Sequence, residues 1–268
     1  MLDLNKIHCG DNVQLMKLIP DSFIDLTVTS PPYDNIRNYN GYSFDFENVA
    51  NELFRVTKDG GIVVWIVNDS TIKGSETLTS FKQALYFKEL GFNVHDTMIW
   101  QKISPFQHKN RYIASFEYMF ILSKGKPKTA NIIKDRKNKW AGTKVHGTLR
   151  HDATGELKEI NGKNKREIKE YGSRLNIWDM AGDKTNKTGH PAIFPVNLIQ
   201  DHIKTWSNEG DLVFDPFIGS GTTAIASMSE NRNWIGIEIS DEYVKIANNR
   251  INTYIEENRN SLVNTYDI

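Results

Sequence analysis

Two apolar strands near opposite ends of this 268-residue chain each end in an unusual turn. The first strand, residues 23–29, runs into a turn with two consecutive prolines at 30–33. The second, residues 212–214, runs into a glycine-rich turn at 215–223, so that 182 positions (215 − 33) separate the two turns. Proline restricts the backbone, whereas glycine lets other groups approach it closely. The chain therefore has to fold around two turns of opposite character, one rigid and one open.

Along the rest of the chain the apolar spacing alternates between helix and strand. Helices are expected at residues 46–57, 79–90, 195–207, 222–230 and 241–257, and further strands at 62–67, 94–101, 117–122 and 234–239. We expect Gly60 and Gly61 to close the first of these helices and Gly91 to close the second. Alternation of this kind favours an α/β sheet.

The composition is that of an ordinary globular protein, with 39% hydrophobic and 25% charged residues. No run approaches the roughly 18 apolar residues of a membrane span, and the N-terminus has no apolar signal-peptide core, so a cytoplasmic protein is expected. Cys9 is the only cysteine, which excludes an intrachain disulfide and a zinc site built from several cysteines. We expect no metal site, and we interpret Cys9 as a small buried hydrophobic residue.

Positively charged residues are concentrated in one segment of the chain. The whole chain has 33 Lys and Arg against 33 Asp and Glu, yet residues 124–174 hold 15 Lys and Arg against 6 Asp and Glu, a net charge of +9. Periodicity also fades over residues 125–172, where Lys, Asn and Gly dominate. We interpret 125–172 as an insertion of loops and short elements, which is either a footprint for a phosphate backbone or a solvated loop.

The glycine turn has the layout of a site for a nucleoside cofactor. Gly219 and Gly221 allow close approach of the backbone, and Glu238 follows 19 positions after Gly219 (238 − 219). That spacing suits a carboxylate that accepts hydrogen bonds from two ribose hydroxyls. Asp215 would repel a pyrophosphate but attract an ammonium group, so a cofactor with an adenosine end and an amino-acid end fits better than NAD or ATP. A plain strand-to-helix turn is the alternative.

These turns resemble the motifs of a known enzyme family. Ser30-Pro31-Pro32-Tyr33 resembles the catalytic motif of the DNA methyltransferases that modify exocyclic amines, and residues 215–223 resemble their S-adenosylmethionine loop. The order of the motifs is similar to that of the family's beta group. The resemblance implies a Rossmann-like α/β sheet that binds S-adenosylmethionine. It predicts a catalytic and cofactor-binding domain at 1–124 and 173–268, with a target-recognition insertion at 125–172.

Shorter segments extend the resemblance. Residues 10–12 look like the family's segment near the cofactor, and residues 190–195 are similar to its approach to the helix that flanks the methionine end. The resemblance therefore predicts these cofactor-binding residues: Asp11, Phe194, Asp215, Phe217, Gly219, Ser220, Gly221, Thr222 and Glu238.

The chemistry of an exocyclic amine explains the proline turn. The lone pair of such an amine is delocalised into the ring, so it becomes nucleophilic only when hydrogen bonds draw its hydrogens out of the ring plane. The hydroxyl of Ser30 and the carbonyl of Pro31, held in a backbone restricted by Pro32, can accept those bonds, while Tyr33 can stack on the base. The methyl group then transfers in line, without a metal or a covalent intermediate. A purely structural turn packed by Tyr33 is the alternative.

The target base and its recognition are predicted less directly. In the family, Ser at the first motif position goes mainly with methylation of cytosine N4 and Asp with adenine N6, so Ser30 favours cytosine, flipped out of a DNA duplex. Methylation of a ring carbon is disfavoured because it needs a cysteine nucleophile, usually in a Pro-Cys pair. Trp140 and His146 either reach bases or pack a small core, and packing is favoured. The predicted DNA-binding residues are Arg37, Arg136, Lys137, Lys139, Lys144, Arg150, Lys165 and Arg166.

Other functions stay open. An adenine-N6 DNA methyltransferase shares the mechanism, and an RNA or protein amine methyltransferase uses related turns. A nucleic-acid-binding protein without activity belongs to a different class, and the intact proline turn and Glu238 argue against it. The resemblance leaves open a homodimer and, as in restriction-modification systems, a cognate restriction endonuclease as partners.

Overall fold

The computed structural model describes residues 1–32, 44–102, 109–144, 150–151, 154–158, 167–180 and 194–263. Helices and strands alternate over most of this chain, in the order β1 (Lys6–Cys9), α1 (Asn12–Met16), β2 (Ile24–Thr29), α2 (Phe46–Val56), β3 (Thr57–Val67), β4 (Thr71–Ile72), β5 (Ser75–Glu76), α3 (Thr79–Leu90), β6 (Asn93–Gln101), β7 (Phe116–Ser123), β8 (Arg136–Lys137), β9 (Arg150–His151), β10 (Leu157–Lys158), β11 (Tyr171–Gly172), β12 (Ile177–Asp179), α4 (Val196–Trp206), β13 (Leu212–Asp215), α5 (Thr222–Ser229), β14 (Asn233–Glu238) and α6 (Asp241–Val263).

Across the described residues the central sheet has eight strands in the order β1-β14-β13-β2-β3-β7-β6-β12. Neighbouring strands run parallel from β1 to β3, and β12 runs parallel to β6. Strand β7 is antiparallel to both of its neighbours, β3 and β6. This mixed sheet, with helices between its parallel strands, confirms the predicted α/β class.

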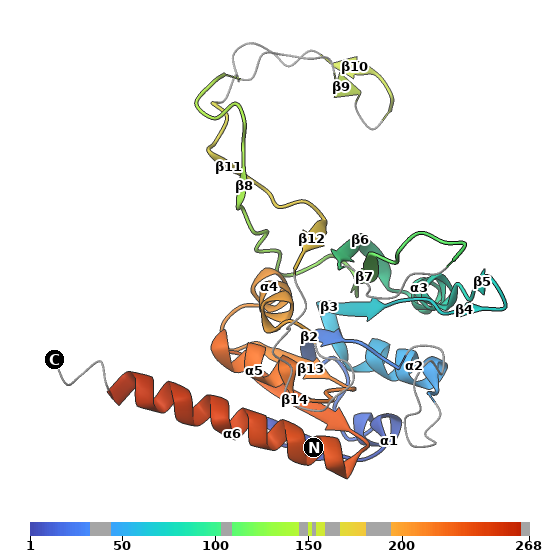
Figure 1. Cartoon of the computed structure of the whole chain (residues 1–268), viewed down its shortest axis with the longest axis vertical. Coiled ribbons are helices and arrows are strands. Elements are labelled where there is room, and N and C mark those ends of the chain that lie inside the picture. The colour runs from blue at the N-terminus through green and yellow to red at the C-terminus, as the bar shows by residue number, and fades with distance from the viewer. Residues whose placement is uncertain are drawn as a thin grey trace. The chain divides into compact units, whose positions relative to one another are not determined.

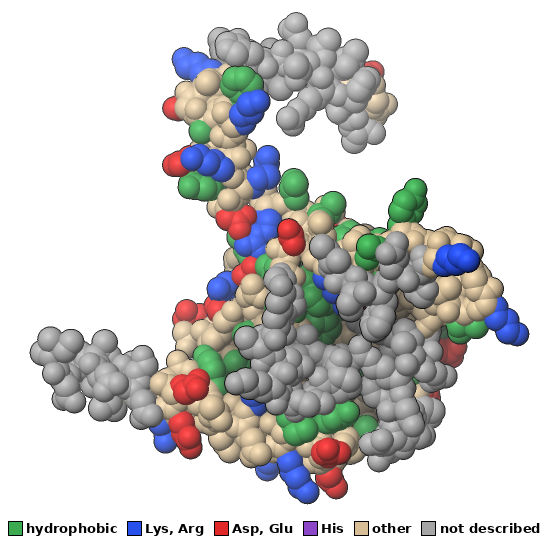
Figure 2. All heavy atoms as spheres, viewed as in Figure 1, with side chains coloured by type: hydrophobic (Ala, Val, Ile, Leu, Met, Phe, Trp, Pro, Cys, Tyr) green, Lys and Arg blue, Asp and Glu red, His purple; other side chains and the backbone are tan. Residues whose placement is uncertain are grey.

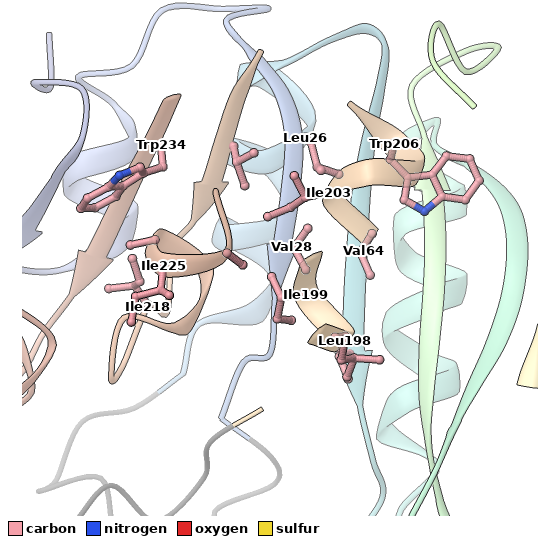
Figure 3. Close-up of a cluster of buried hydrophobic side chains, with 14 of the residues drawn as sticks. Leu26, Val28, Val64, Leu198, Ile199, Ile203, Trp206, Ile218, Ile225 and Trp234 are labelled. Atoms are coloured by element: carbon pink, nitrogen blue, oxygen red, sulfur yellow. The ribbon is translucent and has the colours of Figure 1, made fainter. Parts of the chain in front are cut away.

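Helices cover both faces of the sheet and define two cores (Figure 1). On one face, Ile199 and Ile203 of α4 and Ile225 of α5 pack with Leu26 and Val28 of β2 (Figure 3). The core on this face also contains residues of α6, whereas residues of α1, α2 and α3 lie in the core on the other face. Full burial of one such aliphatic side chain stabilises the fold by roughly 1.5–3 kcal/mol. The central strands β2 and β13, buried from both sides, are therefore firmly held.

Local signals explain where the helices begin and end. Helix α2 begins after Asp45, whose side chain accepts a hydrogen bond from the backbone of Asn48 at 3.3 Å, and its buried residues Val49 and Leu53 form one stripe. Helix α3 ends at Gly91, which has a φ of 114°. Glycine adopts this left-handed conformation without steric cost. The predicted ranges of both helices agree with the structure to within one residue.

The structure corrects one prediction about helix ends and adds short elements that the apolar pattern did not predict. Gly60 and Gly61 do not close α2, which already ends at Val56; they lie inside β3, where the backbone N–H of Gly60 donates to Lys124 at 2.6 Å. Without Cβ atoms these glycines let neighbouring backbone approach, since a Cβ at Gly60 would lie 3.1 Å from the carbonyl oxygen of Lys126. Strands β1 and β12 and helix α1 are too short to show a clear period.

The chain divides into two compact units, Met1–Asn131 with Asn176–Ile268, and Ile132–Leu175. The first unit contains the eight-stranded sheet and every helix named above. Within the second unit, β8 pairs with β11 and β9 with β10, and Arg174 forms an ion pair with Asp135.

In the part of the chain that the structure describes, no helix is long and apolar enough to cross a membrane. No group of three or more His, Cys, Asp and Glu side chains among the described residues could hold a metal ion.

Candidate functional site

The proline turn and the glycine turn lie at the same edge of the sheet. Strands β2 and β13 are parallel neighbours, and each turn follows the carboxyl end of its strand. Thr29 is the last residue of β2, and Asp215 is the last residue of β13. The hydroxyl of Thr29 donates a hydrogen bond to Asp215 Oδ1 at 2.6 Å. Ligands of parallel α/β sheets bind at this edge, outside the carboxyl ends of the strands.

At the proline turn, the described residues are Ser30, Pro31 and Pro32. Pro31 is buried, while Ser30 and Pro32 are partly exposed. Tyr33 lies outside the described residues, as does Arg37. The turn therefore follows a buried strand, with Ser30 at the boundary between core and solvent. Its predicted catalytic role stays a prediction.

The glycine turn folds back on the end of β14. Gly219 and Gly221 have φ values of 49° and 82°, in the left-handed region that favours glycine. The backbone N–H of Gly219 donates to Glu238 Oε2 at 3.0 Å, and that of Ile218 donates to the carbonyl of Ile237 at 3.0 Å. A Cβ at Gly221 would lie 3.2 Å from the Cβ of Ala247, so close packing of α6 also keeps this turn free of side chains.

Glu238 has the burial and the partners of a rigid acceptor. Glu238 is the last residue of β14 and is 9% exposed. The backbone N–H of Ser240 donates a hydrogen bond to Glu238 Oε1 at 2.9 Å. Burial raises the pKa of Glu238, and the backbone donors of Ser240 and Gly219 lower it in part. A carboxylate offers about four acceptor sites, and the backbone N–H groups of Ser240, Gly219 and Ile239 occupy three of them, so Glu238 keeps capacity for a further donor such as a ribose hydroxyl. This geometry fits the nucleoside end of the predicted cofactor.

Asp215 is held differently. Its carboxylate is buried, and it accepts from the hydroxyls of Thr29 and Thr223, each at 2.6 Å, and from the backbone N–H of Phe217 at 3.0 Å. Burial raises its pKa from the ordinary value of 3.8 to about 6, although the three hydrogen bonds act in the opposite direction. Three donors from the protein already bind the carboxylate. Asp215 therefore joins β2, the glycine turn and α5, in addition to its predicted attraction of an ammonium group.

Arg250 contacts the glycine turn, and nothing in the sequence indicated this contact. From α6 its Nη1 donates to the backbone oxygen and the hydroxyl of Ser220, at 2.9 and 3.0 Å, and to the hydroxyl of Thr222 at 3.0 Å. Ser220 and Thr222 are both buried. Their side chains therefore face α6, and their predicted contacts with the cofactor would come from the backbone. An arginine 30 positions beyond the loop gives no local signal in the sequence.

The remaining predicted cofactor residues are Asp11, Phe194 and Phe217, of which Phe217 lies in the glycine turn itself. Asp11 caps α1 by accepting from the backbone N–H of Gln14 at 2.9 Å. The ring of Phe217 lies 5.4 Å from that of Phe44, and the ring of Phe194 lies 5.6 Å from that of Trp100. Cys9 is a correction, because it is exposed rather than buried. Cys9 is the last residue of β1, and its thiol donates a hydrogen bond to Asp241 Oδ1 at 2.9 Å.

Comparison with protein families identifies the chain. A family model described as a DNA methylase, for N6 and N4 methyltransferases, matches residues 24–249. The chain belongs to the N6/N4 DNA methylase family. It is an S-adenosylmethionine-dependent DNA methyltransferase, which confirms the predicted family, enzyme class and cofactor.

Individual relatives agree with this assignment. The methylase is 57% identical over 249 residues to the orphan methyltransferase M.BamHII of Bacillus amyloliquefaciens, covering 88% of this chain and 92% of that protein. It is 28% identical to the type II methyltransferase M.BglII of Bacillus subtilis, covering 96% of this chain and 71% of that protein.

Solved structures support the fold. The cytosine-N4-specific PvuII DNA methyltransferase matches with a TM-score of 0.67 at 20% identity, over 90% of this chain and 84% of that one. The complex of M1.HpyAVI with SAM matches with a TM-score of 0.60 at 24% identity, over 92% of this chain and 98% of that one.

In the second unit of the methylase, the described basic residues predicted to bind DNA are exposed: Arg136, Lys137, Lys139 and Lys144. Figure 2 shows Lys and Arg side chains on this unit, with Asp and Glu among them. Arg150 lies on β9, while Lys165 and Arg166 lie outside the described residues, as does His146. Trp140 is 64% exposed, so the favoured prediction that it packs a small core is wrong. Its ring instead lies 5.5 Å from the amino group of Lys139.

Proposed function

We propose that this methylase transfers a methyl group to N4 of a cytosine that is flipped out of duplex DNA. The observation that carries the proposal is the junction of the two turns. Ser30 follows directly on Thr29, and Thr29 is hydrogen-bonded at 2.6 Å to Asp215, where the glycine turn begins. Acceptors for an exocyclic amine thus emerge beside the loop proposed to hold the methyl donor.

The residues of the two turns divide the work. In this proposal Gly219 and Gly221 admit the cofactor to the backbone, and Glu238 accepts from its ribose. The bound cofactor supplies an electrophilic methyl group on a sulfonium. The hydroxyl of Ser30 and the carbonyl of Pro31 accept hydrogen bonds from the two N–H groups of the amine, which frees its lone pair for attack in line. The methylated amine then loses one of its protons to solvent.

We propose the compact unit Ile132–Leu175 as the target-recognition region, with the other unit as the catalytic and cofactor-binding domain. Its exposed Lys and Arg side chains suit contacts with phosphates, which bind DNA without reading its sequence. Exposed Trp140 is available for contact with a base or a sugar. The homodimer, the cognate nuclease and the cytoplasmic location stay predictions. The relative M.BamHII is described as an orphan methyltransferase, which favours a methylase that acts without a nuclease.

Product analysis tests the proposed base. Duplex DNA of mixed sequence is incubated with the protein and isotope-labelled S-adenosylmethionine, digested to nucleosides and measured by mass spectrometry. Labelled N4-methylcytosine is the expected product. Labelled N6-methyladenine would keep the mechanism and overturn the choice of cytosine.

The Gly219→Val variant is the control, because a side chain on this left-handed glycine disturbs the turn that holds the cofactor. It should give no labelled nucleoside. RNA and a protein extract, incubated in parallel, test the other amine substrates. Label in either one but not in DNA would overturn the DNA substrate.

A further inference from the structure

A buried hydrogen-bonded bridge joins the strand of the proline turn to the loop and helix of the cofactor site. Thr29 donates to Asp215 Oδ1 and Thr223 donates to Asp215 Oδ2, each at 2.6 Å. The three side chains are 2%, 5% and 4% exposed, in that order. The Thr29–Asp215–Thr223 bridge is therefore shielded from water, where hydrogen bonds are strong and an unpaired polar group is costly.

The bridge lies where the two turns leave their strands. Thr29 immediately precedes Ser30, and Asp215 begins the glycine turn, which leads through Gly221 into Thr223 on α5. The backbone N–H of Phe217 also donates to Asp215 Oδ1, at 3.0 Å, so the carboxylate holds the start of the turn as well. A shift of this carboxylate would move both turns relative to each other.

We propose that the Thr29–Asp215–Thr223 bridge is a positioning device, which sets the distance between the acceptors at Ser30 and the methyl donor held by the glycine turn. The inference rests on the proposed catalytic role of the Ser30 turn. In-line transfer requires near-attack geometry, and misplacement by about 1 Å costs roughly 100-fold in rate. Thr29 and Thr223 act through Asp215 and are positioning residues.

Another threonine on the same strand shows that burial alone does not explain Thr29. Thr27 lies two positions earlier on β2, so its side chain points to the same face, and it is 0% exposed. Its hydroxyl has no hydrogen-bond partner among the described residues. Thr27 is therefore a control matched to Thr29 in strand, burial and chemistry, and it lacks the bridge.

The test compares Thr29→Val, Thr29→Ser and Thr27→Val in the full chain. Valine keeps the shape of threonine without its hydroxyl, while serine keeps the hydroxyl. The measurements are the single-turnover rate of methyl transfer to DNA at saturating S-adenosylmethionine, the Kd of the cofactor by calorimetry, and the Tm. We expect Thr29→Val to transfer methyl about 100-fold more slowly, Thr29→Ser to recover most of the rate, and Thr27→Val to stay near wild type.

The double variant Thr29→Val/Thr223→Val tests whether both hydroxyls act through one carboxylate. If they do, the double variant should be little slower than the slower single variant, because the first substitution already frees the carboxylate. Multiplication of the two losses would show independent effects and overturn the bridge. If Thr29→Val does not fold, Thr223→Val tests the same bridge from its other end.

A Thr29→Val enzyme as fast as Thr27→Val would overturn the positioning role. A Thr223→Val enzyme that keeps the full rate would do the same. Failure of the proposed function gives a different result, because Ser30→Ala would then transfer methyl at the wild-type rate, or the labelled product would be N6-methyladenine, whatever the rates of the threonine variants.

Discussion

At the residue scale, Asp215 combines burial with three hydrogen bonds, and the two effects act on its pKa in opposite directions. Burial prevails and raises the pKa from 3.8 to about 6, so the folded protein binds a proton between these pH values that the unfolded chain has released. The contribution of Asp215 to the free energy of unfolding is therefore full below about pH 4 and is lost as the pH rises through about 6.

Chemical denaturation from pH 4 to pH 7 checks this sign. Asp215→Asn cannot titrate, so the free energy of unfolding of the wild type should fall relative to that of the variant as the pH rises through this window. Other carboxylates cancel in the difference between the two proteins. A difference that is flat with pH, or that rises with it, would contradict the raised pKa of Asp215.

Cys9 is exposed, yet its thiol should react slowly. The hydrogen bond to Asp241 is the largest cause that raises its pKa to about 11, followed by partial burial. At pH 8 only about one thiol in a thousand is then ionised, and the thiolate is the reactive form. Because Cys9 is the only cysteine, alkylation of the whole protein reports on this site. The alkylation rate should be well below that of the unfolded chain.

Asp241→Asn removes the negative charge beside the thiol and should accelerate alkylation of Cys9 about tenfold or more. The unfolded protein provides the reference rate. Equal alkylation of the variant and the wild type at pH 8 would mean that Asp241 does not control the thiol. The sequence predicted neither effect, because Cys9 and Asp241 are 232 positions apart.

At the scale of helices and strands, Arg250 ties α6 to the glycine turn through three hydrogen bonds of 2.9 to 3.0 Å. We expect Arg250→Met, which keeps much of the aliphatic stem, to weaken S-adenosylmethionine binding about tenfold, since hydrogen bonds from a charged donor contribute roughly 1.5–3 kcal/mol. The rate of methyl transfer at saturating cofactor should stay within about threefold, because the proline turn is untouched.

Calorimetric titration with S-adenosylmethionine measures this effect. Arg259→Met, at an exposed position on the same helix, is the control for loss of a positive charge. Unchanged affinity in Arg250→Met would show that the turn keeps its shape without α6.

Helices and strands could be predicted from the sequence wherever the apolar pattern repeats over enough residues to show its period. Helix α3 occupies the expected residues, and β2 ends where Pro31 and Pro32 interrupt the backbone pattern. The order of the two motifs along the chain, proline turn first and glycine turn last, also predicted two functional turns. The sequence could not reveal the bridge between them, because Thr29 and Asp215 are 186 positions apart and have no local pattern in common. Contacts of this kind depend on which strands become neighbours.

At the scale of the whole molecule, positive charge concentrates in one segment of a chain that has no net charge. If Lys137 and Lys139 each neutralise one phosphate, the double variant Lys137→Gln/Lys139→Gln should lower the salt dependence of DNA binding by about 1.8 in the slope of log K against log salt. Both side chains are exposed, so stability should change little.

Fluorescence anisotropy with a DNA duplex at several salt concentrations gives this slope. Lys88→Gln, an exposed substitution on α3 in the other unit, is the control for net charge. A slope equal to that of the wild type would remove Lys137 and Lys139 from the DNA interface.

In the proposed mechanism the two turns have different roles: the glycine turn holds the methyl donor, and the proline turn activates the amine. The most direct test is the single-turnover rate of methyl transfer by Ser30→Ala at saturating S-adenosylmethionine. Loss of an acceptor that stabilises developing charge should slow transfer on the order of 100-fold, with cofactor affinity within about threefold of wild type. A rate close to that of the wild type would contradict the assignment of catalysis to the Ser30 turn.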